Sequence, residues 1–385
     1  MSLILAIDTS CDETSVAVTQ GRVVLSNIIA SQAQIHQAYG GVFPTLAKQA
    51  HRDNLPAAVH SALVRARVNW TNISAIAVTQ GPGLAPALEV GIAYAKQLAV
   101  LHNKPLLAIN HIEAHALSPL ALPRARQEQS EQARGSATWP ILSLVISGGH
   151  SEFILIEKIG HYRKLGYTID DAAGECLDKV GRLLSLGYPA GPLLEQFAKQ
   201  GRAGRFVFPK AMQDQANFNL SYSGLKTFAR NQIQQLEANQ QLDRQTVFDF
   251  ACDLQQAVFN QITYKLERIL LSPDLTQAAY PSRHFLKHLT SATTPVTPIN
   301  EVWLGGGVAA NIALRRQLRA TLRKYANLSG KQLPLRVPYH KRLCGDNAAM
   351  IGVVAGFKYQ RQEFATPSSL ERRPNWQIAQ AAITE

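Results

Sequence analysis

The chain has 385 residues, 46% of them hydrophobic, and a formal net charge of +12. This composition predicts a soluble globular protein of two domains, and no apolar run is long enough to span a membrane. The four cysteines are scattered without a C-x-x-C spacing, which argues against a disulfide framework and favours reduced thiols used in packing.

The first predicted element is a hairpin at the start of the chain. Leu3–Ile7 is apolar and predicts a strand, a polar turn over 8–14 follows, and Ser15–Val18 returns as a second strand. The opening segment is too short and lacks the basic flank of a signal peptide, so we expect a strand there. Further on, a strand at Ile73–Thr79 leads through a Gly-Pro-Gly turn into a helix over 84–101.

Two histidines four residues apart follow the next apolar strand. Leu106–Ile109 leads into Asn110, and His111 and His115 then lie at a predicted helix start. Residues four apart share one face of a helix, about 5 to 6 Å apart at Cβ, so both imidazoles can reach one divalent ion. Such a pair also occurs as polar surface or in helix capping, and a metal site needs a further ligand from elsewhere.

The glutamate between these histidines argues against a peptidase. Zinc peptidases with the H-E-x-x-H motif carry their general base directly after the first histidine. Here the order is H-x-E-x-H. A turn of about 100° per residue points Glu113 to nearly the opposite side of the helix from both histidines.

The second half of the chain repeats the arrangement of the first. Ile141–Ile146 predicts a strand, 147–150 a turn and Glu152–Glu157 the return strand. A strand at Val302–Leu304 then leads through three glycines into a helix over 308–325, as in the first half. We predict an α/β fold of two similar lobes, with mainly parallel sheets covered by helices.

The glycine-rich turns lie at equivalent places in both halves and indicate a nucleotide-binding cleft. Repeated glycines let backbone N–H groups approach an anion, and the N-terminus of the following helix adds a favourable dipole. Ligands of such folds bind beyond the carboxyl ends of strands. No turn matches the sequence G-x-x-x-x-G-K-[ST], so a P-loop is excluded.

A helical block follows the second hairpin and is expected to pack as a lid or subdomain. Its predicted helices are 171–186, 192–200, 224–235 and 243–271. Asp170 or Asp171 would cap the first of them. The resulting division is an N-terminal lobe 1–120, a polar insertion 121–138, a C-terminal lobe 139–360 with helical subdomain 170–271 and insertion 272–300, and a polar tail 361–385.

Three residues of this block are candidates for binding a nucleoside. Asp178 lies two turns into its helix, where it is either an exposed helix residue or an acceptor for ribose hydroxyls. Gly191 lies in a stiff turn between prolines and would let a base or sugar approach the backbone. Glu195, one turn further on, is a weaker candidate for the ribose.

Most of the excess positive charge lies between Glu301 and Asp346, where no acidic residue intervenes. The basic residues are Arg315, Arg316, Arg319, Arg323, Lys324, Lys331, Arg336, Lys341 and Arg342. This stripe would attract a polyanion such as RNA. It could equally be a solvated helix face, because several of its arginines recur at intervals of four residues.

Asp346 is our candidate for the missing metal ligand. It lies in Leu343-Cys344-Gly345-Asp346-Asn347, a glycine-containing turn that opens an apolar helix. One carboxylate would join the two imidazoles at the ion.

Taken together, these motifs resemble the tRNA adenosine N(6)-threonylcarbamoyltransferase family, earlier known as O-sialoglycoprotein endopeptidases. The resemblance covers nearly the whole chain. It rests on 7–14, 78–84, 110–115, 147–150, 170–179, 188–192, Gly306-Gly307-Val308 with Asn311, and 344–347. It implies a two-lobed fold of the actin, sugar kinase and Hsp70 ATPase type.

The resemblance also implies site residues. It implies one iron or zinc ion held by His111, His115 and Asp346. It implies substrate contacts from Val145, Ile146, Ser147, Gly148, Gly149, Asp178, Gly191 and Asn311, to which the helix position adds Glu195. Archaeal-type relatives carry Tyr where this chain has Val145, so the ion lacks one potential ligand here. The family more often has Thr where this chain has Gly345, so a hydroxyl that could steady the Asp346 carboxylate is missing.

The implied activity is transfer of a threonylcarbamoyl group from threonylcarbamoyl-adenylate to a tRNA. The acceptor is the exocyclic amine of the adenosine just 3′ of the anticodon, position 37, in tRNAs reading ANN codons, and AMP is released. An inactive paralogue and a small ATPase are the implied companion proteins. The expected location is the cytoplasm of a bacterium or an organellar matrix or stroma. The sequence identifies no general base for the amine.

Rival activities share parts of this pattern. An actin-like-fold ATPase or small-molecule kinase would use the same cleft with Asp8 around Mg²⁺, but it has no need for paired histidines. A metallopeptidase is disfavoured by the H-x-E-x-H order. A non-catalytic scaffold is disfavoured by the intact histidines and Asp346.

Overall fold

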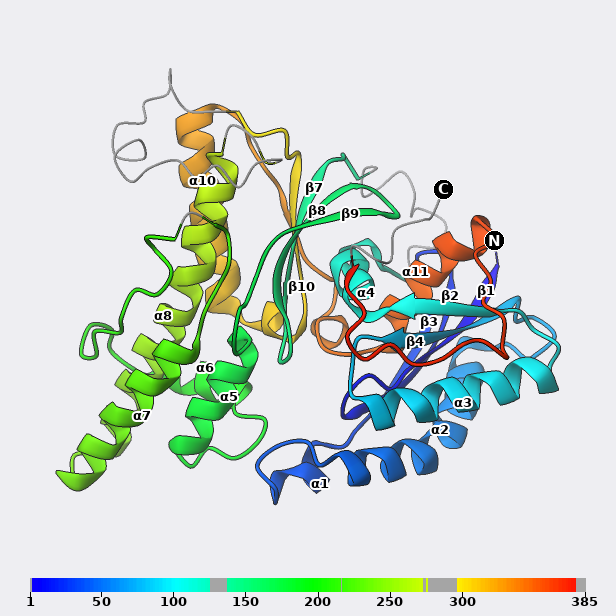
Figure 1. Cartoon of the computed structure of the whole chain (residues 1–385), viewed down its shortest axis with the longest axis horizontal. Coiled ribbons are helices and arrows are strands. Elements are labelled where there is room, and N and C mark those ends of the chain that lie inside the picture. Colours follow the sequence, from blue (N-terminus) through cyan, green and yellow to red (C-terminus); the bar gives the residue numbers. More distant parts are fainter. Residues whose placement is uncertain (1, 125–136, 216, 273–274, 276–295, 379–385) are drawn as a thin grey trace. The chain divides into compact units, whose positions relative to one another are not determined.

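The computed structural model describes residues 2–124, 137–215, 217–272, 275 and 296–378 (Figure 1). Most of both predicted insertions, 121–138 and 272–300, therefore lies outside the described residues. The chain divides into two compact units: residues 1–137, 158–162 and 337–385 form the first, and 138–157 with 163–336 form the second. No helix in the described residues is both long enough and apolar enough to cross a membrane.

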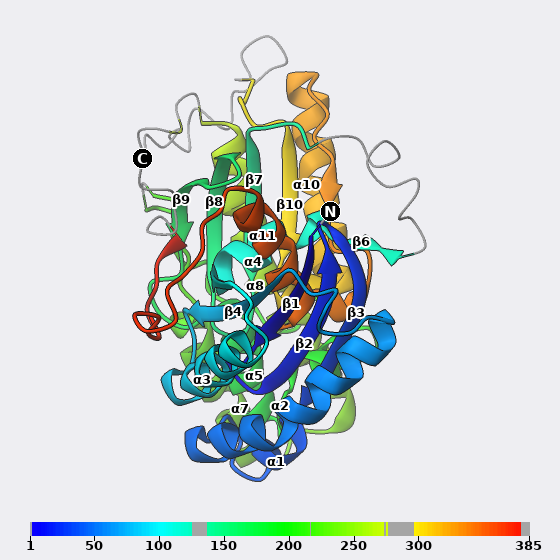
Figure 2. The same cartoon turned by 90° about the vertical axis from the view of Figure 1, so that its right-hand side faces the viewer.

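The first unit is built on a six-stranded sheet of order β5-β4-β1-β2-β3-β6. Its strands are β1 (Leu3–Asp8), β2 (Glu13–Gln20), β3 (Val23–Ser31), β4 (Ala75–Gly81), β5 (Leu106–Asn110) and β6 (Leu122–Pro123). Its helices are α1 (Ala33–Gln37), α2 (Pro44–Ala66), α3 (Ala85–Leu101), α4 (His111–Leu117), η1 (Ser118–Leu120), η4 (Lys341–Leu343) and α11 (Ala348–Gln360). Strands β1, β2 and β3 run side by side in Figure 2.

The alternation of side chains in β1 sends apolar groups to both faces of this sheet. Leu5 and Ile7 join the core formed with α2 and α3, while Ile4 and Ala6 are equally buried but belong to the other face. That other face is covered by α11, which packs on β1, β2 and α4. A strand buried on both faces is expected to be apolar throughout, as β1 is.

The second unit is built on a five-stranded sheet of order β11-β10-β7-β8-β9. Its strands are β7 (Ile141–Ile146), β8 (Ser151–Lys158), β9 (His161–Tyr167), β10 (Glu301–Gly305) and β11 (Leu335–Arg336). Its helices are α5 (Ala173–Leu183), α6 (Gly191–Ala198), α7 (Ser223–Ala238), α8 (Arg244–Leu270), η3 (Gly307–Ala310) and α10 (Ile312–Ser329). The predicted helical block is present, with α8 packed against α6 and α10.

The two sheets have equivalent strand orders, which confirms the predicted duplicated actin-like α/β fold. In each unit a hairpin and a third strand come first, and two further strands then join the side of the first strand. Parallel pairs outnumber antiparallel ones among the described strand pairings, as expected, but both sheets are mixed because each contains a hairpin. β1 pairs antiparallel with β2, as β7 does with β8, since a short turn reverses the chain, whereas β4 and β10 join their sheets in parallel.

The C-terminal boundary of the lobes differs from the predicted division. The sequence analysis placed 139–360 in one lobe, whereas the contacts of α11 place residues from 337 onward in the first unit. α11 is buried along most of its length against the first sheet. An apolar helix carries no mark of the sheet that it will cover, so the sequence does not reveal this return.

Asp170 and Asp171 do not cap α5, contrary to the prediction. The helix begins at Ala173, and Asp170 instead accepts hydrogen bonds from residues 221–223 at the start of α7, including Tyr222 N at 2.7 Å. Asp171 pairs with Lys179 of α5 at 2.6 Å and with Lys226 of α7 at 2.5 Å. Both acids therefore connect the helices of the second unit rather than cap the helix that follows them.

Candidate functional site

The two histidines are positioned by a well-capped helix. Asn110 ends β5, and its Oδ1 accepts hydrogen bonds from Ile112 N at 2.9 Å and Glu113 N at 3.0 Å, which caps α4. His111 and His115 then occupy successive turns of α4, and their ring centroids lie 4.6 Å apart. The predicted helix start and the shared face are thus both present.

Asp346 lies beside both histidines. His115 Nε2 is 3.1 Å and His111 Nε2 is 3.5 Å from Asp346 Oδ1. Ligands about 2.1 Å from a metal are separated by about 3.0 Å in an octahedral site and about 3.4 Å in a tetrahedral one. The three residues form a group whose ligand atoms all lie within 4.8 Å of one another. The spacing therefore fits one divalent ion, and all three residues belong to the first unit.

The charges of the three groups depend on one another. Burial would lower the pKa of His111, but the attraction of Asp346 and Asp8 outweighs it and raises that pKa to about 9. Burial and the neighbouring His111 lower the pKa of His115. Burial would raise the pKa of Asp346, but both histidines hold it well below its ordinary value. Without a metal, this cluster is a buried ion pair with an adjacent neutral imidazole.

Asp8 is a further residue of this centre that the sequence analysis did not place beside the histidines. It is fully buried at the end of β1, and its Oδ2 lies 3.6 Å from His111 Nδ1. Its Oδ1 accepts hydrogen bonds from Thr79 Oγ1 at 2.8 Å and Ser10 N at 3.1 Å. A carboxylate on the far nitrogen of a metal-bound imidazole orients the ring and raises its basicity. The position of Asp8 at a strand end was the available signal.

Glu113 takes no part in the cluster, as its place in the sequence predicts. Its side chain is fully buried, and its Oε1 accepts a hydrogen bond from Tyr162 Oη at 2.6 Å. Burial raises the pKa of this carboxyl, although Lys358 partly offsets the effect. A carboxyl held in this way has no access to a water molecule at the histidines, so the arrangement does not supply a peptidase base.

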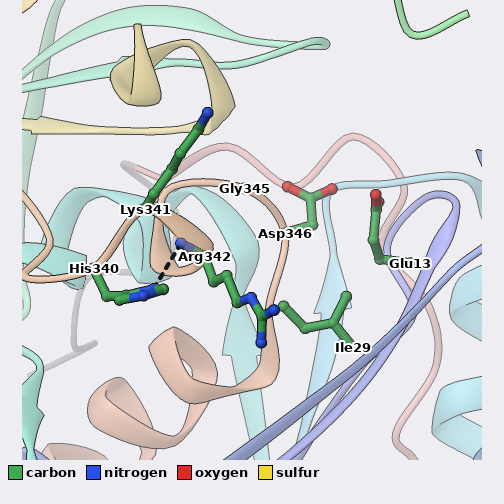
Figure 3. Close-up of a pocket in the computed structure, with 7 residues that line it drawn as sticks. All are labelled: Glu13, Ile29, His340, Lys341, Arg342, Gly345 and Asp346. Carbon is green, nitrogen blue, oxygen red and sulfur yellow. Dashed lines mark hydrogen bonds between the residues drawn. The ribbon is translucent and has the colours of Figure 1, made fainter. Parts of the chain in front are cut away.

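A hollow of about 540 Å³ adjoins Asp346 in the first unit (Figure 3). It is lined by Glu13, Ile29, His340, Lys341, Arg342, Gly345 and Asp346. Figure 3 shows Asp346 and Glu13 at one side and Lys341 at the other, with the end of the Arg342 side chain between them in this view. Burial and the neighbouring Asp12 raise the pKa of Glu13 well above its ordinary value.

In the second unit, three glycine-containing segments meet at the ends of β7 and β10. A Cβ on Gly306 would lie 2.3 Å from Ile146 O, and one on Gly174 would lie 2.6 Å from Ser147 O. A Cβ on Gly148 or Gly149 would meet nothing, so this turn is open. The segments therefore need glycine where they touch and leave exposed backbone between them, which is the arrangement of an anion-binding turn.

The candidates on β7 differ in what they expose. Val145 and Ile146 are fully buried, so their side chains cannot contact a ligand. Ser147 Oγ accepts a hydrogen bond from His150 N at 3.0 Å, which stabilises the conformation of the turn. The backbone of Ser147 is also used within the protein, because its N–H donates to His150 O at 2.7 Å and its carbonyl accepts from Gly174 N at 3.2 Å. Contact with a substrate would therefore come from the exposed backbone of Gly148 and Gly149.

The remaining candidates lie at two helix starts in the same unit. Asp178 Oδ1 accepts hydrogen bonds from Ala190 N at 2.8 Å and Gly191 N at 2.9 Å, so it ties α5 to the start of α6. Glu195 Oε1 accepts from the N–H of residue 312 at 3.0 Å, at the start of α10. Asn311 caps the same helix and donates to residue 255 at 2.7 Å. All of them position backbone at these helix starts, a role that the spacing in the sequence did not predict.

Comparison with known proteins agrees with this picture. The family model of tRNA N6-adenosine threonylcarbamoyltransferase matches residues 23–353. A relative of that name from Geotalea uraniireducens is 37% identical over 98% of this chain and 96% of its own length. One from Nostoc punctiforme is 38% identical over 92% and 90% of the two chains.

Solved structures of low sequence identity also align with the chain. The (R)-2-hydroxyglutaryl-CoA dehydratase component A of Acidaminococcus fermentans aligns over 94% of this chain and all of its own with a TM-score of 0.48 and 12% identity. The extent and identity of the sequence matches are what identify the chain. It belongs to the tRNA N6-adenosine threonylcarbamoyltransferase family of tRNA-modifying transferases.

Proposed function

We propose that this chain transfers the threonylcarbamoyl group from threonylcarbamoyl-adenylate to the exocyclic amine of adenosine 37, in tRNAs reading ANN codons, and releases AMP. The observation that carries the proposal is the group His111, His115 and Asp346, whose three ligand atoms lie within 4.8 Å of one another. Neither a kinase nor a scaffold of this fold has a use for such a set. Family membership supports the choice of tRNA as acceptor.

The three residues would hold one Fe²⁺ or Zn²⁺ ion, since two imidazoles and one carboxylate suit either metal. When bound, the ion would supply Lewis acidity toward the transferring carbonyl or a fixed point for the threonyl carboxylate. Asp8 would orient the His111 ring through Nδ1, across the 3.6 Å that separate the two groups. Its second oxygen is held by Thr79 and Ser10, so this orientation is rigid.

The glycine turns of the second unit would bind the adenylate. The backbone N–H groups of Gly148 and Gly149 are suited to a phosphate, and the open space at both glycines permits a close approach. Asp178 and Glu195 would fix the turns before α6 and α10 through the hydrogen bonds described above. Gly191 and Asn311 complete the proposed substrate contacts. Because the adenine amine is a poor nucleophile, holding it close to the carbonyl is the main contribution of such a site.

The decisive experiment reconstitutes the reaction. The chain is incubated with the proposed companions, an inactive paralogue and a small ATPase, together with threonine, bicarbonate, ATP and unmodified tRNA. The tRNA is then digested and analysed by mass spectrometry. We expect threonylcarbamoyladenosine with the native chain and none with His111→Ala/His115→Ala. Absence of the product with the native chain and active companions would refute the proposal.

The runner-up is an ATPase or small-molecule kinase, because Asp8 ends β1 at a turn where such enzymes bind Mg²⁺. The same double variant separates the two functions. A transferase loses its stoichiometric iron or zinc and its product together, whereas a kinase keeps its ATP turnover. We propose the cytoplasm, or an organellar matrix or stroma, as the location, because that is where tRNA is modified.

A further inference from the structure

We infer that Lys341 and Arg342 form a docking site for the anticodon-loop phosphates of the tRNA, at the hollow beside Asp346. The inference rests on the proposed function and adds to it the residues that hold the acceptor. The cations of the basic stripe between 315 and 342 differ in their surroundings.

Several cations of the stripe are used within the second unit. Arg336 Nε lies 2.7 Å from Glu301 Oε2, and Lys324 pairs with Glu267. Lys331 Nζ donates to the carbonyl of residue 297 at 2.9 Å. Carboxylates partly neutralise Arg336 and Lys324, and a backbone carbonyl holds the Lys331 ammonium.

Lys341 and Arg342 differ from these cations in three ways. They belong to the first unit, as do His111, His115 and Asp346. Both are exposed, and within the described part of the chain neither side chain makes an ion pair or hydrogen bond. Both line the hollow that Asp346 also lines (Figure 3).

The turn that carries the two cations is held firmly. Arg342 N donates to His340 Nδ1 at 3.1 Å, and Leu343 N donates to the carbonyl of the same histidine at 3.0 Å. Leu343 and Cys344 follow as buried anchors. Because the backbone of this turn is fixed, both cations are held at the rim of the hollow while their charged ends stay flexible. Binding a ligand there would not cost the backbone entropy that a mobile loop would lose.

The chemistry of the hollow matches a nucleotide in a single-stranded loop. The side of the hollow formed by Asp346 and Glu13 would accept a neutral base, while Lys341 and Arg342 would attract the phosphates that flank that base. A nucleotide bound in this orientation would have its base directed toward the proposed metal site. Phosphate contacts of this kind fix the register of a nucleic acid without reading its sequence.

The expected effect follows from counterion release. Each phosphate contact on a single strand contributes about 0.7 to the slope of log K against log salt, so two contacts contribute about 1.4. Relative to 1 M salt, this corresponds to about 25-fold tighter binding at 0.1 M. The double variant Lys341→Gln/Arg342→Gln should therefore bind tRNA about 25-fold more weakly than the native chain at 0.1 M salt.

The test measures binding of unmodified tRNA to the full chain between 0.05 and 0.5 M salt. The matched control is Arg52→Gln/Arg65→Gln, which removes two exposed charges from α2 of the same unit. We expect the slope to fall by about 1.4 in the first variant and to stay unchanged in the control. Thermal unfolding and metal content, measured for all three proteins, show whether each is folded.

Two outcomes overturn the inference. The first is a slope of log K against log salt that is unchanged in Lys341→Gln/Arg342→Gln or that falls equally in the control. Either result means that the two cations contribute only to the overall positive charge and form no specific phosphate site. A higher KM for threonylcarbamoyl-adenylate with an unchanged tRNA slope means that the phosphate bound there is the adenylate's. Binding is measured without turnover, so failure of the proposed transfer would appear separately, as product missing from the native chain.

Discussion

Replacing Asp8 by Asn tests whether the buried carboxylate behind His111 serves the proposed metal. Asn keeps the shape and an acceptor for Thr79, but it removes the charge 3.6 Å from His111 Nδ1. At an effective dielectric constant of about 20, one charge pair at this distance is worth at most about 4.6 kcal/mol. Loss of such an outer carboxylate typically weakens metal binding by about 10 to 100-fold, or about 1.4 to 2.7 kcal/mol. We expect a loss in that range.

The assay is competition for Zn²⁺ against a chromophoric chelator at pH 7.5. Glu113→Gln is the matched control. Glu113 is as fully buried as Asp8 and lies on α4 with His111, but its carboxylate contacts Tyr162 instead of His111. It should bind Zn²⁺ within about twofold of the native chain. If the two variants weaken binding equally, or Asp8→Asn binds like the native chain, then the charge behind His111 does not serve the metal and the reasoning fails.

Three further predictions concern pH, capping and the glycine turns. The pKa of His111 is raised from 6.5 to about 9 without metal, so the stability that its protonation contributes is complete below about pH 6.5 and is lost as pH rises through about 9. Urea unfolding of the metal-free chain should show this fall in the free energy of unfolding. The variant His111→Gln should not show it. Asn110→Ala should lower the free energy of unfolding by about 1 kcal/mol through the lost cap of α4, and an unchanged unfolding midpoint would contradict this role. Gly174→Ala places a Cβ 2.6 Å from Ser147 O, so the KM for the adenylate should rise while Zn²⁺ affinity stays native; a loss of Zn²⁺ affinity instead would contradict our assignment of the turn.

Local patterns in the sequence predicted much of this structure. The two hairpins, the capped helix of His111 and His115, and the turn at Asp346 each follow from residues within about a dozen positions of one another. Apolar runs, a capping Asn and the four-residue spacing act through short-range geometry. These elements could be predicted because neighbouring residues alone determine them.

The missed features depend on contacts between distant segments. No element was predicted over 23–66, where α2 carries Pro56 in its interior and a weak apolar stripe, so only packing on β2 and α3 fixes it as a helix. Asp8 meets His111 because β1 and β5 belong to one sheet. Asp170 caps a helix that begins 53 residues further on, at Ser223. Sequence spacing gives no measure of such pairings.

The return of α11 to the first sheet has a consequence for synthesis of the protein on the ribosome. The opening strands emerge early, but one face of their sheet stays uncovered until residues 348–360 have been translated. Asp346 arrives in the same late stretch as the helix. A prematurely terminated chain would therefore expose apolar strands to chaperones and proteases and lack an acid for the ion, so incomplete copies would be removed rather than accumulate as half-active enzyme.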